Sequence, residues 1–216
     1  MRAYLRAKVE KDDYYLRNMW VWPQYFGMDF LKLGDNGILV DCGAYIGDSI
    51  ETYCDHVNSY KKIYAFEPDN ANIEEMRKLI SDKDLHDVEI IPYATYSKKT
   101  VLEYDMRGGI DSRIAEYGKY NSDNIVRLET ETIDNVVGDD NVTYIKMDVE
   151  GSEMEALRGA ERTIKRCKPI CGISAYHKKD DIIQIYKLLH EYNPDYKFYF
   201  REHRPLAIDA VLYAVP

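Results

Sequence analysis

The sequence predicts an α/β domain in which short buried strands alternate with helices. The apolar runs at residues 38–41, 61–66 and 142–148 have the composition of strands that are covered on both faces. A helix-like segment follows each of these runs, and residues 180–192 carry apolar side chains at helical spacing. Strands that alternate with helices in this way are typical of a parallel sheet with helical crossovers.

The first part of the chain comes before the alternating strands and helices. Residues 1–33 are charged and aromatic, and we expect a helical N-terminal extension that packs on the core. A Gly-Asp-Asn-Gly turn at residues 34–37 then opens a single domain over residues 34–216. Within it we predict a first strand and helix at residues 38–41 and 46–57.

The alternation continues and is then interrupted. A second strand and helix are expected at residues 61–66 and 69–81, and a third strand at residues 88–92. Residues 97–130 break the pattern, because residues 100–104 and 124–128 are strand-like and no helix separates them. We predict a small β insertion after strand three, on the side of the sheet where ligands enter.

The last third of the chain returns to the core pattern. Thr132 is expected to cap a short helix that ends at Val137. The remaining elements that we predict are a fourth strand at 142–148, a helix at 150–164, a fifth strand at 169–175, a helix at 180–192 and a closing hairpin at 197–200 and 210–215.

Composition limits the class of protein. The chain has 216 residues, a length that suits one domain, and a net charge of −9. An acidic balance argues against nucleic acid or an anionic membrane as partner. The four cysteines match neither a zinc motif nor a Cys-x-x-Cys redox site, and no stretch has the length of a signal peptide or membrane span. We expect reduced thiols and a cytoplasmic protein.

The turn after the first strand is suited to binding a ribose. Gly43 and Gly47 allow a tight bend and a close approach of the backbone to a ligand. The second strand ends at Glu67, whose carboxylate can accept hydrogen bonds from both ribose hydroxyls, and Pro68 stiffens the turn after it. A glycine turn with such an acid about 20 residues later is how a βαβ unit holds a ribose-bearing cofactor.

The same turn argues against a dinucleotide. Tyr45 stands where the fingerprint Gly-x-Gly-x-x-Gly has the glycine that contacts a pyrophosphate. S-adenosylmethionine has a ribose and no pyrophosphate, so it fits better than NAD. Asp41 is then expected to face the positive amino-acid end of this cofactor, directly or through water.

Candidate catalytic residues lie at the ends of the fourth and fifth strands. Asp148 and Glu150 come at the end of the fourth strand, where the carboxyl ends of the strands line the ligand crevice. His177 comes after the fifth strand, and imidazole is the usual base near neutral pH. These three residues could instead hold a divalent metal, but no spacing motif supports that alternative, and we predict no metal. Glu153 is expected to favour the N-terminal dipole of the next helix.

These motifs resemble the FkbM family of methyltransferases, which use S-adenosylmethionine. The Lys-x-Asp-x-Glu-Gly-x-Glu pattern is the specific part of the resemblance, whereas the glycine turn is generic. The similar segments lie in the order of the family, at residues 40–47 (VDCGAYIG), 65–68 (AFEP), 144–153 (YIKMDVEGSE), 157–160 (LRGA), 175–177 (AYH) and 211–214 (VLYA).

The resemblance implies a doubly wound, mostly parallel seven-stranded sheet with a reversed last strand. It also implies O-methylation of a hydroxyl on a sugar, polysaccharide or related natural product. Residues 94–96 are similar to the loop that borders the adenine, and Ser112 and Arg113 resemble an inserted serine-containing loop. The candidate cofactor-binding residues are Asp41, Gly43, Ala44, Tyr45, Gly47, Glu67, Pro68, Ala94 and Asp148.

Three functions stay open at this stage. In a methyltransferase, His177 or Asp148 would take the proton of the attacking hydroxyl of a small-molecule or glycan acceptor. A catalytically silent nucleoside-binding module would keep the fold without the reaction. A nicotinamide-dependent oxidoreductase is the third reading, and Tyr45 in the glycine turn argues against it.

Overall fold

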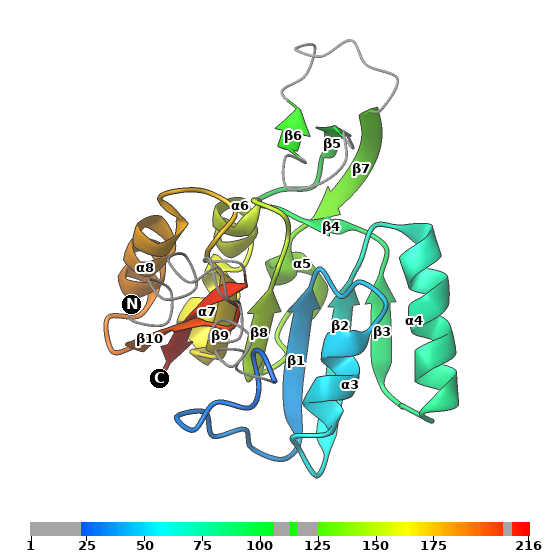
Figure 1. Ribbon diagram of the computed structural model, residues 1–216, viewed down its shortest axis with the longest axis horizontal. Helices are drawn as coiled ribbons and strands as arrows, with labels where there is room; N and C mark the ends of the chain where they lie inside the picture. Colours follow the sequence, from blue (N-terminus) through cyan, green and yellow to red (C-terminus); the bar gives the residue numbers. More distant parts are fainter. Residues whose placement is uncertain (1–22, 106–112, 116–124, 205–208) are drawn as a thin grey trace, which may run out of the picture.

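A seven-stranded sheet forms the centre of the molecule, in a computed structural model that describes residues 23–105, 113–115, 125–204 and 209–216 (Figure 1). Neighbouring strands follow the order β10-β11-β9-β8-β1-β2-β3, and only β11 runs antiparallel to its neighbours. The predicted doubly wound sheet with a reversed last strand is therefore confirmed. Its strands are β1 (Gly37–Cys42), β2 (Tyr60–Phe66), β3 (Val88–Ile91), β8 (Tyr144–Met147), β9 (Ile170–Ser174), β10 (Lys197–Glu202) and β11 (Ala210–Val215).

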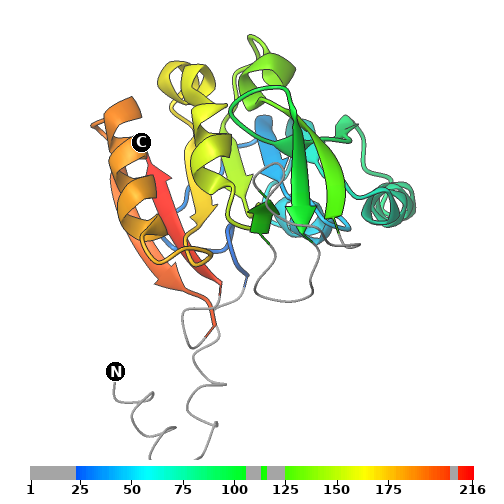
Figure 2. The same cartoon turned by 90° about the horizontal axis from the view of Figure 1, so that it is seen from above.

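Helices cover both faces of this sheet (Figure 2). Apolar residues of α3 (Asp48–Cys54) and α4 (Asn70–Asp82) pack into the core on one face. The other face is covered by α5 (Ile133–Val137), α6 (Glu153–Arg158), α7 (Glu161–Cys167) and α8 (Asp181–Tyr192). The strands β1 and β8 are buried along their whole length, which explains their mostly apolar sequences; Asp41 and Lys146 are the charged exceptions.

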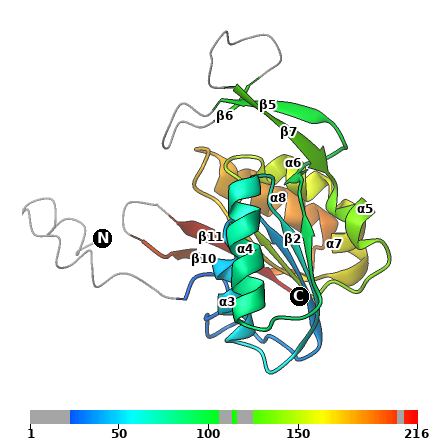
Figure 3. The same ribbon diagram turned by 90° about the vertical axis from the view of Figure 1, so that its right-hand side faces the viewer.

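A second, smaller sheet stands beyond the carboxyl ends of the parallel strands (Figures 1 and 3). Its strand order is β4-β7-β5-β6, with β4 (Ala94–Thr95), β5 (Val101–Asp105), β6 (Arg113–Ala115) and β7 (Ile125–Glu131). The predicted β insertion is confirmed. The sequence did not predict β4 or β6, both of which were expected to be loop. Ser112 lies outside the described residues.

The prediction of one helix over residues 150–164 is wrong, because this stretch contains two helices, α6 and α7. Glu150 and Gly151 have φ angles of 52° and 90°, so the helix begins only at Glu153. A second interruption separates α6 from α7 at Gly159, where a Cβ would lie 2.1 Å from the backbone oxygen of Tyr96. The break therefore lets the loop after β4 pack closely against the helical face.

The expected helical extension is also wrong for residues 23–33, which form turns. Pro23 and the positive φ of Tyr25, 70°, are incompatible with a continuous helix here. Tyr25 and Phe26 instead enter the core on the face that α3 and α4 cover, beside Tyr144 and Tyr213. Residues 1–22 lie outside the described part of the chain. Among the helices that are described, none combines the length and apolarity that crossing a bilayer requires.

Candidate active site

A pocket of about 670 Å³ opens at the carboxyl ends of β1, β2 and β8, beneath the small sheet. Its volume lies within the range of small-molecule and cofactor sites, roughly 300–1,000 Å³. Leu102, Val126 and Leu128 of the small sheet contribute apolar lining. The predicted site residues that line the pocket are Gly43, Tyr45, Glu67, Pro68, Ala94, Asp148 and Glu150.

Glu67 is held rigidly at the end of β2. Its Oε2 accepts a hydrogen bond from the Tyr45 amide at 2.9 Å, and its Oε1 accepts one from the Asp69 amide at 2.9 Å. The side chain is only 6% exposed, and burial raises the pKa of its carboxyl although these amide donors oppose the rise. Oε1 also accepts from Asn72 Nδ2 at 3.3 Å, whereas Oε2 keeps lone-pair capacity for a further donor such as a ribose hydroxyl.

The glycine turn is shaped by packing as well as by ligand access. Gly43 has a φ of 76°, and a Cβ there would lie 1.9 Å from the backbone oxygen of Asp148. The turn after β1 therefore fits directly against the end of β8. Ala44 and Gly47, which we also predicted to bind the cofactor, are buried and are not among the residues that line the pocket; Gly47 donates its amide to the Ala44 oxygen at 2.8 Å.

Asp41 lies behind the pocket wall. It is fully buried, Ser49 donates a hydrogen bond to it, and Lys146 Nζ is 2.9 Å from its Oδ1. Burial lowers the pKa of Lys146, but the charges of Asp41 and Asp148 raise it by more, so the amine is charged. Asp41, which we predicted to face the cofactor directly or through water, does not line the pocket, whereas its ion-pair partner Lys146 does.

Two buried polar atoms in the pocket wall have no hydrogen-bond partner among the described residues. They are Oγ1 of Thr95, at the end of β4, and Nε2 of Gln24. Buried polar atoms without partners are rare in folded proteins and carry a free-energy cost. The Thr95 hydroxyl, near the expected adenine position, and the Gln24 amide, elsewhere in the wall, can both hydrogen-bond a polar nucleoside ligand. The residues present therefore fit S-adenosylmethionine.

Asp148 lies at the end of β8, and phenol hydroxyls approach both of its carboxylate oxygens. Tyr25 Oη donates to its Oδ2 at 3.1 Å, and Tyr176 Oη donates to its Oδ1 at 3.3 Å. Ser174 Oγ is 2.8 Å from Tyr25 Oη and fixes that phenol in turn. The carboxylate is thus fixed in one orientation at the edge of the pocket.

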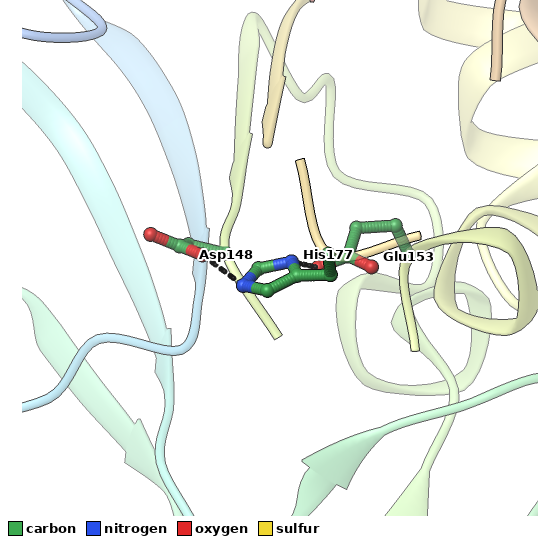
Figure 4. A group of neighbouring side chains, drawn as sticks. All are labelled: Asp148, Glu153 and His177. Carbon is green, nitrogen blue, oxygen red and sulfur yellow. Dashed lines mark ion pairs between the residues drawn. The ribbon is translucent and has the colours of Figure 1, made fainter. Parts of the chain in front are cut away.

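His177 lies between two carboxylates, as Figure 4 shows. Its Nδ1 is 2.9 Å from Glu153 Oε1, and its Nε2 is 3.6 Å from Asp148 Oδ1 and 3.5 Å from Glu150 Oε2. These are ion-pair distances, and neither ring nitrogen is aligned for a hydrogen bond with a described residue. The predicted residues Asp148, Glu150 and His177 are therefore brought together, although His177 stands behind the pocket wall.

The charges around His177 change its proton affinity. Burial lowers the pKa of His177, but Glu153, Asp148 and Glu150 raise it by more, and the net pKa is raised. Burial raises the pKa of Glu153, but His177 and the backbone amides lower it by more. Glu153 is fully buried and its Oε1 also accepts hydrogen bonds from the amides of Val149 and Gly151, so it is an ionised partner of the imidazole.

The same cluster can be compared with a metal centre. Ligand atoms of Asp148, Glu153 and His177 lie within 4.8 Å of one another. The imidazole stands between the two carboxylates, however, and opposite ring nitrogens face them (Figure 4). Asp148 and Glu150 face Nε2 and Glu153 faces Nδ1, so an ion bound at Nε2 would be shared with Asp148 and Glu150 and not with Glu153.

The strand order and the pocket at the carboxyl ends of the strands are those of the class I methyltransferase fold. The family model of the methyltransferase FkbM domain matches residues 41–200. The chain belongs to the FkbM family of S-adenosylmethionine-dependent methyltransferases, as the sequence motifs predicted.

Solved structures agree with this assignment. The FkbM methyltransferase from Methylobacillus flagellatus is 26% identical, with a TM-score of 0.76 over 98% of this chain. This chain spans about half, 52%, of the length of that protein. No curated protein sequence matches the chain.

Two more distant structures share the fold and contain the cofactor or its product. They are a Streptococcus mutans methyltransferase in complex with SAH (TM-score 0.50, 12% identity, 84% of this chain and 89% of that one) and Aeropyrum pernix fibrillarin with bound S-adenosyl-L-methionine (TM-score 0.52, 11% identity, 88% and 71%).

Sequence reasoning missed several residues of the site. Lys146 is the lysine of the Lys-x-Asp-x-Glu-Gly-x-Glu pattern. A lysine inside a strand that is otherwise apolar could have indicated a buried ion pair, which Lys146 forms with Asp41. Glu153 was assigned to the helix dipole, although its place in the same motif indicated proximity to Asp148. Gln24 and Tyr25 carried no local signal, because only the tertiary fold brings them to the pocket.

Proposed function

We propose that this protein transfers the methyl group of S-adenosylmethionine to a hydroxyl oxygen of a sugar, a polysaccharide or a related natural product. The support is the placement of His177 at ion-pair distance from Asp148 and Glu150, the two carboxylates that line the pocket next to the glycine turn. A raised histidine pKa beside a cofactor pocket suits the acceptance of a hydroxyl proton near neutral pH.

The cofactor supplies an electrophilic methyl group on its sulfonium. Glu67 would hold the ribose, and Thr95 would offer its hydroxyl at the adenine end. The acceptor hydroxyl would lie beside Asp148 and Glu150, and its proton would pass by way of one of these carboxylates to Nε2 of His177, which stands behind the pocket wall. As the oxygen–carbon bond formed, the carbon–sulfur bond would break and S-adenosylhomocysteine would leave. The charge of Glu153, whose Oε1 lies 2.9 Å from the other nitrogen, Nδ1, would stabilise the imidazolium. Alignment of the two reactants and this proton transfer are what the protein contributes.

Substitution of His177 tests this assignment. We expect His177→Asn to lower kcat by roughly 100- to 1,000-fold with an unchanged Kd for S-adenosylhomocysteine, because a general base acts only on the chemical step. Asp148→Asn, made in parallel, distinguishes the two candidate bases. If Asp148→Asn abolishes turnover while His177→Asn retains the normal rate, Asp148 is the base and this proposal for His177 is wrong.

The acceptor is identified by transfer of a labelled methyl group. Purified protein and labelled S-adenosylmethionine are incubated with sugar, polysaccharide and polyketide-like alcohols, and product ethers are detected by mass spectrometry. His177→Asn serves as the matched control. A catalytically silent module would bind S-adenosylhomocysteine and label none of these acceptors.

The state of the cysteines supports a cytoplasmic location, and the net charge supports the kind of acceptor that we propose. All four cysteines are unpaired, and Cys42 and Cys171 are fully buried, where burial raises the pKa of each thiol. Such cysteines are typical of the reducing cytoplasm. The net charge of −9 favours a small-molecule or glycan acceptor over nucleic acid or an anionic membrane.

A further inference from the structure

Tyr25 belongs to a segment that precedes the region matched by the family model, residues 41–200. Its side chain is nevertheless buried, with 6% exposed, and lines the cofactor pocket beside Gln24. The backbone around it is fixed by two tyrosines of the core sheet. Tyr213 Oη accepts from the Tyr25 amide at 3.0 Å, and Tyr144 Oη donates to the Tyr25 oxygen at 2.5 Å.

The hydroxyl of Tyr25 contacts two groups of the site. It donates to Asp148 Oδ2 at 3.1 Å and lies 2.8 Å from Ser174 Oγ. Burial, and then the charge of Asp148, raise the pKa of the Tyr25 phenol well above its usual value, so the group is a permanent donor. Lys146 Nζ lies 5.6 Å from the centroid of the ring, which places the phenol beside the charged wall of the pocket.

The backbone of Tyr25 is strained. A non-glycine residue with a φ of 70° is uncommon, and such a conformation persists only where surrounding contacts hold it. Here those contacts aim the side chain at Asp148. The unpartnered Nε2 of the neighbouring Gln24 shows that this short segment also presents a donor to the pocket that no described residue satisfies.

We propose that Tyr25 is a positioning residue for the cofactor site: its hydroxyl fixes the Asp148 carboxylate in the orientation that contacts S-adenosylmethionine. The segment before the family domain is therefore part of the functional site. This role depends on binding of the cofactor and is independent of the hydroxyl acceptor proposed above, so failure of methyl transfer to any alcohol would leave it standing.

A double-mutant cycle tests this role in the full chain. Calorimetry gives the Kd of S-adenosylhomocysteine for the wild type, Tyr25→Phe, Asp148→Asn and the double variant. We expect Tyr25→Phe to weaken binding roughly three- to tenfold, the usual net effect of one hydrogen bond, and to add nothing in the Asp148→Asn background. A wild-type Kd for Tyr25→Phe, or equal losses in both backgrounds, would overturn the proposal.

Two further variants separate positioning from folding. Tyr196→Phe removes a buried phenol that donates to the Pro169 oxygen at 2.6 Å in the core on the opposite face of the sheet, and its Kd should equal that of the wild type. Ser174→Ala removes the second partner of Tyr25 and keeps the ring, so it remains informative if Tyr25→Phe fails to fold. We expect a loss of about twofold that disappears in the Asp148→Asn background, and an undiminished loss there would contradict the proposal.

Discussion

The two ends of the pocket are held by different kinds of contact. At the β1–β2 end, Glu67 accepts hydrogen bonds from the nearby amides of Tyr45 and Asp69, so the binding group is fixed by local backbone. At the β8–β9 end, Asp148 and His177 are fixed by side chains, among them Tyr25, which is 123 positions away from Asp148 in the sequence. The comparison teaches that a local motif can define where a cofactor binds, while distant residues define how the reacting groups are oriented.

Gly43→Ala should have the largest effect, because this position joins the two ends. A Cβ would lie 1.9 Å from the Asp148 oxygen, and the φ of 76° adds strain. We expect the free energy of unfolding to fall by about 3 kcal/mol or more, measured by urea denaturation. Gly34→Ala is the control: its φ is not positive and a Cβ there would have no atom within 4 Å, so a change of less than about 0.5 kcal/mol is expected. Equal losses would contradict the close fit of the two ends.

Glu67→Ala tests the local end alone. The ribose loses its acceptor and the amides of Tyr45 and Asp69 lose theirs, so the Kd for S-adenosylhomocysteine should rise roughly 100-fold. Glu89→Ala, which removes an exposed acid that pairs with Lys62 on the neighbouring strands, is the control and should bind normally. A change of less than threefold for Glu67→Ala would show that Glu67 does not hold the ribose.

This difference between the ends also explains what sequence could predict. Gly43 and Glu67 each follow directly after a strand, β1 and β2, so the apolar pattern of the strand and the spacing between the two residues were enough to predict them. Asp148 and His177 were located because parallel strands end at one edge of a sheet. The contacts of Tyr25 and the Glu153–His177 pair depend on long-range packing, which no local pattern encodes. The close approach of the Tyr96 oxygen to Gly159, at the break between α6 and α7, was missed for the same reason.

Glu153→Gln tests the side-chain end. Loss of the Glu153 charge lowers the pKa of His177, so the acidic limb of the pH–rate profile should shift to lower pH, and kcat at the plateau should fall about tenfold as the ring loses its orientation. Glu155→Gln, on the same helix but paired with Ser97 and Arg158, should change neither quantity. A lower rate with an unmoved profile would indicate that Glu153 has no electrostatic effect on His177.

The stability of the same pair should depend on pH with a defined sign. The pKa of His177 is raised by folding, so its contribution is complete below its unfolded value, about 6.5, and is lost as pH rises through the folded value. The pKa of Glu153 is lowered, so its contribution is present above about 4.3 and is lost as pH falls through the folded value. Asp148, Glu150, Asp181 and Asp209 also act on this imidazole.

Denaturation of the wild type and His177→Asn between pH 4 and 9 measures this contribution. The difference in unfolding free energy should be greatest between about pH 4.5 and 6.5, where it is expected to include about 1 kcal/mol from the ion pair, and should shrink above neutrality. A difference that grows with increasing pH would contradict the charges assigned to the pair.

The central claim is that the β1–β2 end binds S-adenosylmethionine through Glu67. A crystal structure with S-adenosylhomocysteine tests it most directly. We predict both ribose hydroxyls within hydrogen-bond distance of the Glu67 carboxylate, the adenine near Ala94 and Thr95, and the amino-acid end near Asp148. A saturated crystal with this pocket empty, or with the ribose away from Glu67, would contradict the account.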